Sequence, residues 1–191
     1  MSYRFFVVIF LIIIGSGLGL YSVIHNGFYP VAFVNFHMIS ANNLDQNYNA
    51  AIRYFNNALL TYGSNPEILK ESGSKTEIKR AALNKLIVDW LVFDETKKRL
   101  GKDLNQITEK IISQELTNPR LEEAVKEIYG LTLEDFKKQV LLAQAYREIL
   151  EGRMFSEKQD FNKWLEDVTQ EARVIILIPN FSWDGKQVIP Q

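Results

Sequence analysis

The stretch SKTEIKRAALNKLIVDWLVFDETKKRL, residues 74–100, has apolar residues that recur at three- and four-residue intervals. On a helix these residues form one broad stripe, made of Ile78, Ala82, Leu83, Leu86, Ile87, Trp90, Leu91 and Phe93. Val88 and Val92 lie on the side opposite to much of this stripe. A helix that is apolar around so much of its circumference packs on more than one side. The sequence therefore predicts that residues 74–100 are the central helix of a helical domain.

Both ends of this helix carry terminal signals. Ser74 and Glu77 have the spacing of a capping box, in which each side chain satisfies a backbone N–H at the helix start. The cations at residues 97–99 suit the negative end of the helix dipole, and Gly101 follows as a C-terminal cap.

Composition excludes several classes of function. The chain has 191 residues, a net charge of −1 and no cysteine, so disulfides, thiolate metal sites and a cysteine nucleophile are excluded. The near-neutral charge gives no electrostatic case for a nucleic-acid partner. The two histidines, His25 and His37, do not form a zinc-binding pattern, and we expect a turn or surface position for His37. We predict no metal and no cofactor.

An uncharged run, FFVVIFLIIIGSGLGLYSVI, occupies residues 5–24. Its length matches the roughly 20 residues that a helix needs to cross a bilayer. Arg4 precedes the run and the next charge is Asp45, so the positive-inside rule predicts a cytoplasmic amino terminus. We therefore predict a cytoplasmic stub at residues 1–4, a single-pass anchor at residues 5–24, a linker at residues 25–30 and an extracytoplasmic remainder.

A cleaved signal peptide is the alternative interpretation of this run. Its apolar region typically spans only about 7–15 residues and ends at an A-x-A-like site, which Gly15-Ser16-Gly17 matches imperfectly. Gly15 and Gly19 form a small-xxx-small pair, which is a weak indication that two anchors associate.

Strand-like runs occur at both ends of the remaining chain. Residues 31–34, VAFV, follow Pro30, and residues 174–178, VIILI, form a continuous β-branched run that Pro179 stops, the pattern of a buried strand. A two-stranded ribbon is stable only when it packs on other elements, so we expect these two strands to pair against the helices. The tail, residues 179–191, is expected to form a short turn or a loose end.

Helical patterns fill the residues between the two strands. Ser40 is the expected cap of a helix over residues 41–62, and Asn65-Pro66 is expected to start a single turn. Further helices are predicted at residues 104–115, between Asn118-Pro119 and Gly130, from Thr132 with Asp135 to residue 155, and after a Ser156–Gln159 cap. The predicted fold is mainly α, with one domain of five to six helices over residues 31–178 and a two-stranded sheet formed by its ends.

No catalytic constellation is evident. Adjacent carboxylates occur at Asp94/Glu95, Glu122/Glu123 and Glu134/Asp135. Neighbouring residues on one helix do not face each other, so we expect solvated helix surfaces rather than acid–base pairs. Without a nucleophile–base set we predict that the protein is not an enzyme, and we assign no catalytic, cofactor-binding or metal residues.

The aromatic residues are the more informative set. They fall on the predicted apolar stripes, and comprise Phe55, Tyr62, Trp90, Phe93, Tyr129, Phe136, Tyr146, Phe161 and Trp164. We expect most of them in the core and a minority in a groove for unfolded or amphipathic chains. The sequence does not identify which ones would bind a client.

Three blocks occur in the order seen in a known domain family. Residues 31–46, VAFVNFHMISANNLDQ, resemble the opening motif of the SurA-type amino-terminal chaperone domain, which also occurs in PpiD-like and PrsA-like relatives. Residues 81–104, AALNKLIVDWLVFDETKKRLGKDL, and 131–150, LTLEDFKKQVLLAQAYREIL, are similar to its later blocks. Three positions depart from the family pattern, since Phe36 replaces a usual Gly, Thr96 replaces Ala, and the last apolar residue of the second block is displaced to Leu104.

The resemblance implies a helical domain, closed by an end strand, that binds unfolded proteins outside the cytoplasm. Many relatives carry a parvulin-type prolyl isomerase domain, but residues 150–174 leave room only for a helix, so the resemblance does not extend to isomerase activity. The predicted function is a membrane-tethered chaperone or holdase for unfolded or newly translocated polypeptides. The alternative is a structural or docking subunit of an envelope complex.

Overall fold

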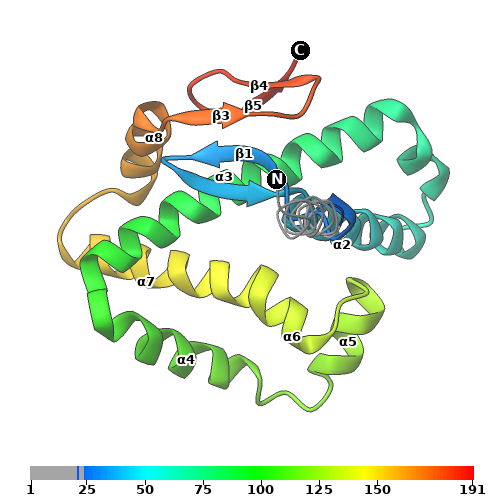
Figure 1. The fold of residues 1–191 in the computed structure, drawn as a ribbon. Coiled ribbons are helices and arrows are strands. Elements are labelled where there is room, and N and C mark those ends of the chain that lie inside the picture. The colour runs from blue at the N-terminus through cyan, green and yellow to red at the C-terminus, as the bar shows by residue number, and fades with distance from the viewer. Residues whose placement is uncertain (1–20, 22–23) are drawn as a thin grey trace, which may run out of the picture.

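The protein is mainly helical, with two small antiparallel sheets (Figure 1). A computed structural model describes residue 21 and residues 24–191. The helical elements are α2 (Ala41–Thr61), η1 (Pro66–Lys70), α3 (Ser72–Leu100), η2 (Gly101–Asp103), α4 (Leu104–Glu115), α5 (Leu121–Ile128), α6 (Leu133–Phe136), η3 (Lys137–Leu141), α7 (Leu142–Ser156) and α8 (Phe161–Glu171). The strands are β1 (Pro30–Val34), β2 (His37–Ser40), β3 (Val174–Ile176), β4 (Phe181–Trp183) and β5 (Val188–Pro190).

The first sheet joins the two ends of the domain. Its strand order is β2–β1–β3, and Phe33 of β1 lies opposite Ile175 of β3. The predicted pairing of the two terminal runs is confirmed, but the prediction of only two strands is wrong, because β2 adds a third. β3 is also an edge strand with exposed Ile175, not the fully buried strand that its β-branched run predicted.

A two-residue turn at Asn35 and Phe36 connects β1 to β2. Both residues have positive φ, 47° and 71°, as the tight turns of twisted hairpins require. The backbone N–H of Asn35 donates to the carbonyl oxygen of Arg173, and its side-chain oxygen accepts from the N–H of Arg173, at 3.0 and 2.9 Å. The turn therefore forms without the usual Gly and is tied to the residue before β3.

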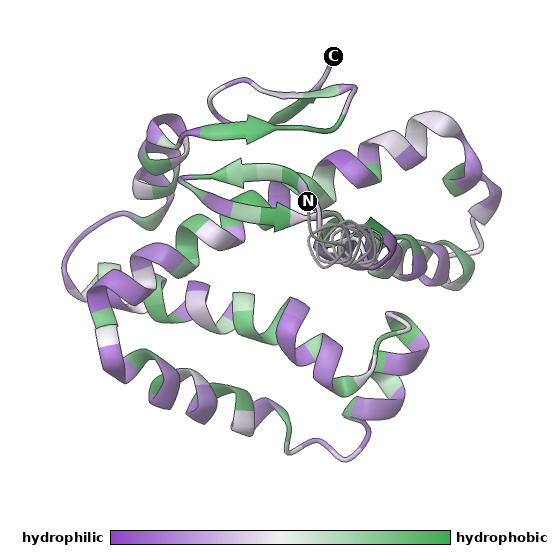
Figure 2. Cartoon of the chain, in the orientation of Figure 1, coloured by the Kyte–Doolittle hydropathy of each residue, from purple (hydrophilic) through white to green (hydrophobic). Residues whose placement is uncertain are grey.

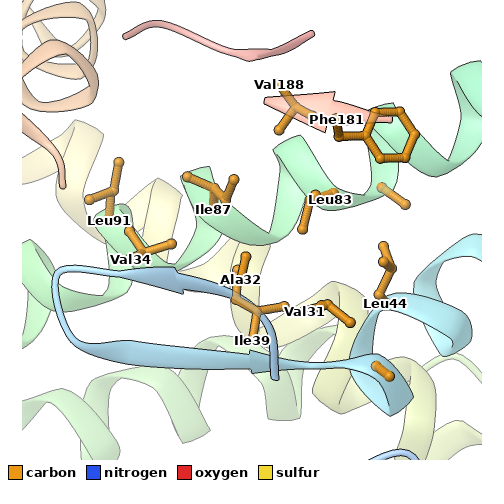
Figure 3. Close-up of a cluster of buried hydrophobic side chains, with 12 residues drawn as sticks. Val31, Ala32, Val34, Ile39, Leu44, Leu83, Ile87, Leu91, Phe181 and Val188 are labelled. Atoms are coloured by element: carbon orange, nitrogen blue, oxygen red, sulfur yellow. The ribbon is translucent and has the colours of Figure 1, made fainter. Parts of the chain in front are cut away.

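The main core lies between this sheet and α3. Ala32, Val34 and Ile39 of the hairpin point toward Leu83 and Ile87 of α3 (Figure 3). Two further cores lie in the remaining helices, one around Phe136 between α4, α5, α6 and α7, and one around Val92, Met154 and Phe161. α3 contributes to the first and the third core, which confirms its prediction as a helix packed on more than one side.

The predicted loose end at residues 179–191 is wrong. These residues form the second sheet, β4–β5, in which Phe181 and Val188 are buried against α3 (Figure 3). The guanidinium of Arg80 donates to the carbonyl oxygen of Val188 at 2.7 Å, and the N–H of Val188 donates to the side chain of Asn84 at 3.0 Å. Two polar side chains of α3 thus hold the carboxyl-terminal hairpin in place.

The predicted helix caps have mixed outcomes. Ser40 and Thr132 accept from the N–H groups of Asn43 and Asp135, as predicted. The cap at Ser74 is wrong because α3 already begins at Ser72, and the cap at Ser156 is wrong because Asp160 caps α8 by accepting from the N–H of Lys163.

The predicted anchor at residues 5–24 lies almost entirely outside the described residues, as do Gly15 and Gly19. Among the residues that the structure describes, no helix has the length and apolar character needed to cross a membrane.

Candidate functional site

Two neighbouring cavities lie between α2, α3 and the η3–α7 segment. The first, of about 340 Å³, is bounded by the start of α2, the middle of α3 and the start of α7. The second, of about 230 Å³, lies between the middle of α2 and Tyr129. Asn47 and Gln139 line both cavities. We call the two cavities together the cleft.

A ladder of aromatic rings forms one wall of the first cavity. The imidazole of His37 stacks on the indole of Trp90, whose ring centroid lies 5.2 Å from that of Phe93. The ring of Phe93 lies 5.0 Å from that of Tyr146. All four side chains are only partly buried, so the wall presents apolar surface to the cavity.

Three elements bring this ladder together. Trp90 and Phe93 are three residues apart and share one face of α3. β2 places His37 on one side of them, and α7 places Tyr146 on the other. Burial lowers the pKa of His37 and raises that of Tyr146, so both rings are neutral near pH 7.

Gln139 spans the cleft between the two cavities. It lies in η3, a π-helical turn whose wider geometry is often found at functional sites. Its side-chain nitrogen donates to the side-chain oxygen of Gln46 on α2, and its backbone carbonyl accepts from Lys85 on α3, both at 3.3 Å. The side-chain oxygen of Gln139 is buried and has no partner within the described chain. Because this oxygen is shielded from water, it can accept from a bound donor group only after the Gln139 side chain turns toward the cavity.

A partly exposed ion pair lies next to Gln139. The ammonium group of Lys85 is 2.5 Å from the carboxylate of Asp89, one turn along α3. Burial raises the pKa of Asp89, and the nearby Lys85 opposes that shift. The pair gives the cleft a polar floor with little net charge.

The second cavity is almost wholly apolar in its lining. Tyr54 of α2 stacks on Tyr129 with centroids 5.5 Å apart, and Phe55 lies beside it. Tyr54 and Phe55 are exposed. Asn57 joins α2 to the end of α5 next to this cavity, because its side-chain nitrogen donates to the carbonyl oxygens of Glu127 and Ile128.

The prediction that most aromatic residues belong to the core is confirmed in part, because Trp90, Tyr129, Tyr146 and Trp164 pack against the cores without being fully buried. Of the nine predicted residues, only Phe136 and Phe161 are buried. Tyr62 is exposed at the end of α2. The structure brings Trp90, Phe93 and Tyr146 together in the first cavity, and the second contains both Phe55 and Tyr129. Trp164 is partly buried and packs against Phe161, away from the cleft.

The predicted carboxylate pairs lie on helix surfaces. Asp94 pairs with Lys98 and Glu95 with Arg99, one turn along α3 in each case. The other two pairs occupy the first turns of α5 and α6: Glu122, Glu123, Glu134 and Asp135. None of these carboxylates lines either cavity.

Sequence reasoning missed His37, Gln139 and Asp89 as cleft residues. The strand that positions His37 was not predicted, and a π-helical turn leaves no mark in apolar spacing. The one available signal was Asp89, a carboxylate inside the apolar pattern of residues 78–93.

The cleft has the composition of a binding site. It combines a partly exposed aromatic wall with a few fixed polar groups, the usual make-up of a recognition site. Among the described residues no cluster of three or more His, Asp or Glu side chains is arranged to hold a metal ion. Comparison of the chain with protein-family models, curated proteins and solved structures finds no significant match.

Proposed function

We propose that the protein is a membrane-tethered extracytoplasmic holdase that binds unfolded or newly translocated polypeptides in the cleft, without prolyl isomerase activity. The observation that carries this proposal is the aromatic wall of Trp90, Phe93 and Tyr146, which lies open to the first cavity. The order of the three sequence blocks that resemble a SurA-type chaperone domain supports it. Between α7 and β3 the chain forms only α8, which accords with a domain that has no isomerase insertion.

The physical basis of client binding is burial of apolar side chains. Moving one Leu or Phe side chain from water into an apolar site contributes roughly 1.5–3 kcal/mol. Immobilising the client opposes this gain. One side chain in either cavity therefore gives weak binding, and two neighbouring cavities allow one segment to engage both. Such contacts are reversible, as release of a client for folding requires.

The polar groups of the cleft can form hydrogen bonds with the client backbone. An extended segment carries N–H groups between its side chains, and the unpartnered oxygen of Gln139 lies between the two cavities. Once the Gln139 side chain turns toward a cavity, a client N–H that donates to its oxygen satisfies an acceptor that is otherwise buried without a partner. Binding then depends on backbone and apolar character rather than on one sequence.

A light-scattering assay tests the proposal. The full chain in lipid nanodiscs is mixed with a denatured envelope protein that is diluted into buffer, and empty nanodiscs serve as the blank. We expect near-equimolar chain to suppress aggregation. Unchanged scattering with several clients, from a chain shown to be folded, would contradict the holdase function.

A matched pair of variants ties the assay to the cleft. Ala143→Glu places a carboxylate in the first cavity, whereas Gln144→Glu adds the same charge at the next, exposed position of α7. We expect the first variant to lose most of the suppression and the second to retain it.

A docking subunit of an envelope complex is the second candidate. The Gln139 contacts to Gln46 and Lys85 hold the cleft walls in one arrangement, which suits one fixed partner. Co-purification separates the two functions, because a docking subunit brings down one protein in stoichiometric amount and a holdase brings down many at low occupancy.

A further inference from the structure

The solvent-facing side of the three-stranded sheet is apolar. Ala32 and Val34 of β1 are buried in the core, so Phe33 between them points away from it. The partners of Phe33 across the sheet are Met38 and Ile175, and both are exposed. Hydropathy colouring shows β1 and β3 as largely hydrophobic (Figure 2). We call the following residues the outer face: Phe33, Phe36, Met38, Ile175 and Leu177.

Leu177 and Phe36 extend this face beyond the strands. The N–H of Leu177 donates to the carbonyl oxygen of Val31 at 2.8 Å, so the pairing of β3 continues to this residue. Strand alternation then puts Leu177 on the same side as Ile175. Phe36 lies at the opposite end, at the tip of the hairpin.

Phe36 is both strained and exposed. Its φ of 71° lies in the left-handed region, which disfavours a residue with a Cβ. Its side chain is 88% exposed, the highest value among the large apolar side chains that the structure describes. The guanidinium of Arg173 lies 5.9 Å from the centre of its ring. Neither core packing nor turn geometry explains a Phe at this position. We therefore look for a contact between this side chain and something outside the domain.

The outer face is close to the end of the apolar run. The uncharged run ends at Ile24, and β1 begins at Pro30. Even fully extended, the residues between them span only about 20 Å. The carbonyl oxygen of Gly27 accepts from the N–H of Asn42, so this short connection is held against the start of α2. Phe28 and Tyr29 within the connection are exposed aromatic residues, the type enriched at membrane interfaces.

We propose that the outer face of the sheet docks on the lipid bilayer to which residues 5–24 anchor the chain. Phe36 and Leu177 enter the interfacial region, and Arg173 keeps its charge among the lipid headgroups beside the ring of Phe36. The proposal rests on the membrane tether of the proposed function. It adds a fixed orientation, in which the sheet contacts the bilayer and the cleft is held at a constant position relative to it.

Single-cysteine labelling tests this docking, because the natural chain has no cysteine. The full chain is reconstituted into liposomes with a fluorescent label at Phe36→Cys or Met38→Cys. Tyr62→Cys and Phe155→Cys are matched controls, since these aromatic residues are 84% and 85% exposed and lie outside the sheet, Tyr62 just after α2 and Phe155 in α7. Quenchers attached to lipid acyl chains report bilayer contact, and aqueous iodide reports water contact.

We expect lipid quenching at positions 36 and 38 to exceed that at positions 62 and 155 by at least threefold, with the reverse order for iodide. Equal quenching at all four positions overturns the docking. A third outcome is that positions 36 and 38 are shielded from both quenchers, and that this shielding disappears when the samples are diluted into more lipid. In that case a second copy of the chain covers the outer face, and the docking proposal is overturned.

A background substitution guards against a misfolded variant. Gly adopts positive φ readily, so Phe36→Gly keeps the turn while removing the ring. In that background we expect lipid quenching at position 38 to fall toward the control value.

Aggregation suppression is measured on the same samples. If suppression persists while labels 36 and 38 remain open to iodide, docking fails and the holdase function stands. If lipid quenching appears without suppression, the holdase function fails and docking stands.

Discussion

The imidazole of His37 lies parallel to the indole of Trp90, with ring centroids 3.3 Å apart and an angle of 6° between the planes. This stack joins β2 to α3 at the edge of the cleft. It makes a titratable ring part of the aromatic wall.

Acidification is expected to destabilise the fold through His37. Burial lowers its pKa below the ordinary value of 6.5, so the unfolded chain binds a proton at higher pH than the folded chain. The stability that neutral His37 contributes is therefore present above pH 6.5 and is lost as the pH falls through 6.5 toward the folded pKa. Urea unfolding at pH 7.5 and 5.5 measures the loss.

His37→Phe keeps the stacked ring and removes the titration. We expect this variant to lose less stability than the natural chain between the two pH values. His25→Phe controls for the other histidine. Identical pH dependence in the natural chain and in His37→Phe would contradict the expectation.

Phe36→Gly is expected to stabilise the domain. Gly carries no Cβ and accepts the positive φ of 71° at this position, although its greater freedom in the unfolded chain offsets part of the gain. We expect an increase of about 0.5–1 kcal/mol in the free energy of unfolding relative to Phe36→Ala, which removes the ring and keeps the Cβ. Equal stability of the two variants would show that the turn is not strained.

Val188→Ala is expected to destabilise the domain by about 2 kcal/mol, because it leaves a void in the main core. Val188 is fully buried, and three residues follow it in the sequence. Gln187→Ala is the control, since the Gln187 side chain is exposed in the preceding position. Denaturant unfolding compares the two, and similar small effects would mean that β5 does not belong to the cooperative core.

Removing Lys85 and removing Asp89 are expected to lower the stability of the domain by different amounts. Burial raises the pKa of Asp89, so at neutral pH its charged form is held in place by Lys85. Lys85→Met leaves that carboxylate without its cation and is expected to cost about 1 kcal/mol, since the partly exposed pair is screened by water. Asp89→Asn removes the charge and is expected to cost less.

The pH dependence of this pair has a defined sign. A raised pKa means that the folded chain binds a proton more readily than the unfolded chain, so the contribution of Asp89 to stability declines as the pH rises through its folded pKa. We expect Asp89→Asn to remove this acid-range decline. If Asp89→Asn lowered the free energy of unfolding at neutral pH by more than Lys85→Met does, Lys85 would not be the group that stabilises the charged form of Asp89.

The helices could be predicted because their signals are local. Ser40 and Thr132 cap through N–H groups three residues away, and the stripe of α3 repeats within a single element. The pairing of β1 with β3 was also predictable, because no other strand-like runs were available. Each of these inferences needed only neighbouring residues or a process of elimination.

The remaining features depend on contacts between distant residues. β2 has four residues and follows a turn without Gly, so it has no strong strand signal. The carboxyl-terminal hairpin is held by Arg80 and Asn84 of α3, which no local pattern connects to Val188. The cleft arises where η3 places Gln139 against α2 and α3. Its aromatic residues carry the same spacing as core residues, so periodicity alone could not separate the two.

The pairing of Phe33 with Ile175 also determines when the first sheet can form during synthesis of the chain. β1 precedes the helices α2–α8 in the chain, whereas its partner β3 and the buried Val188 follow them and are synthesised later. Closing so long a loop costs entropy before the contacts at its ends can offset it. The main core between the sheet and α3 therefore stays incomplete until β3 and Val188 have been made. A chain stalled before β3 exposes apolar residues of this core, as do the clients proposed for the finished cleft.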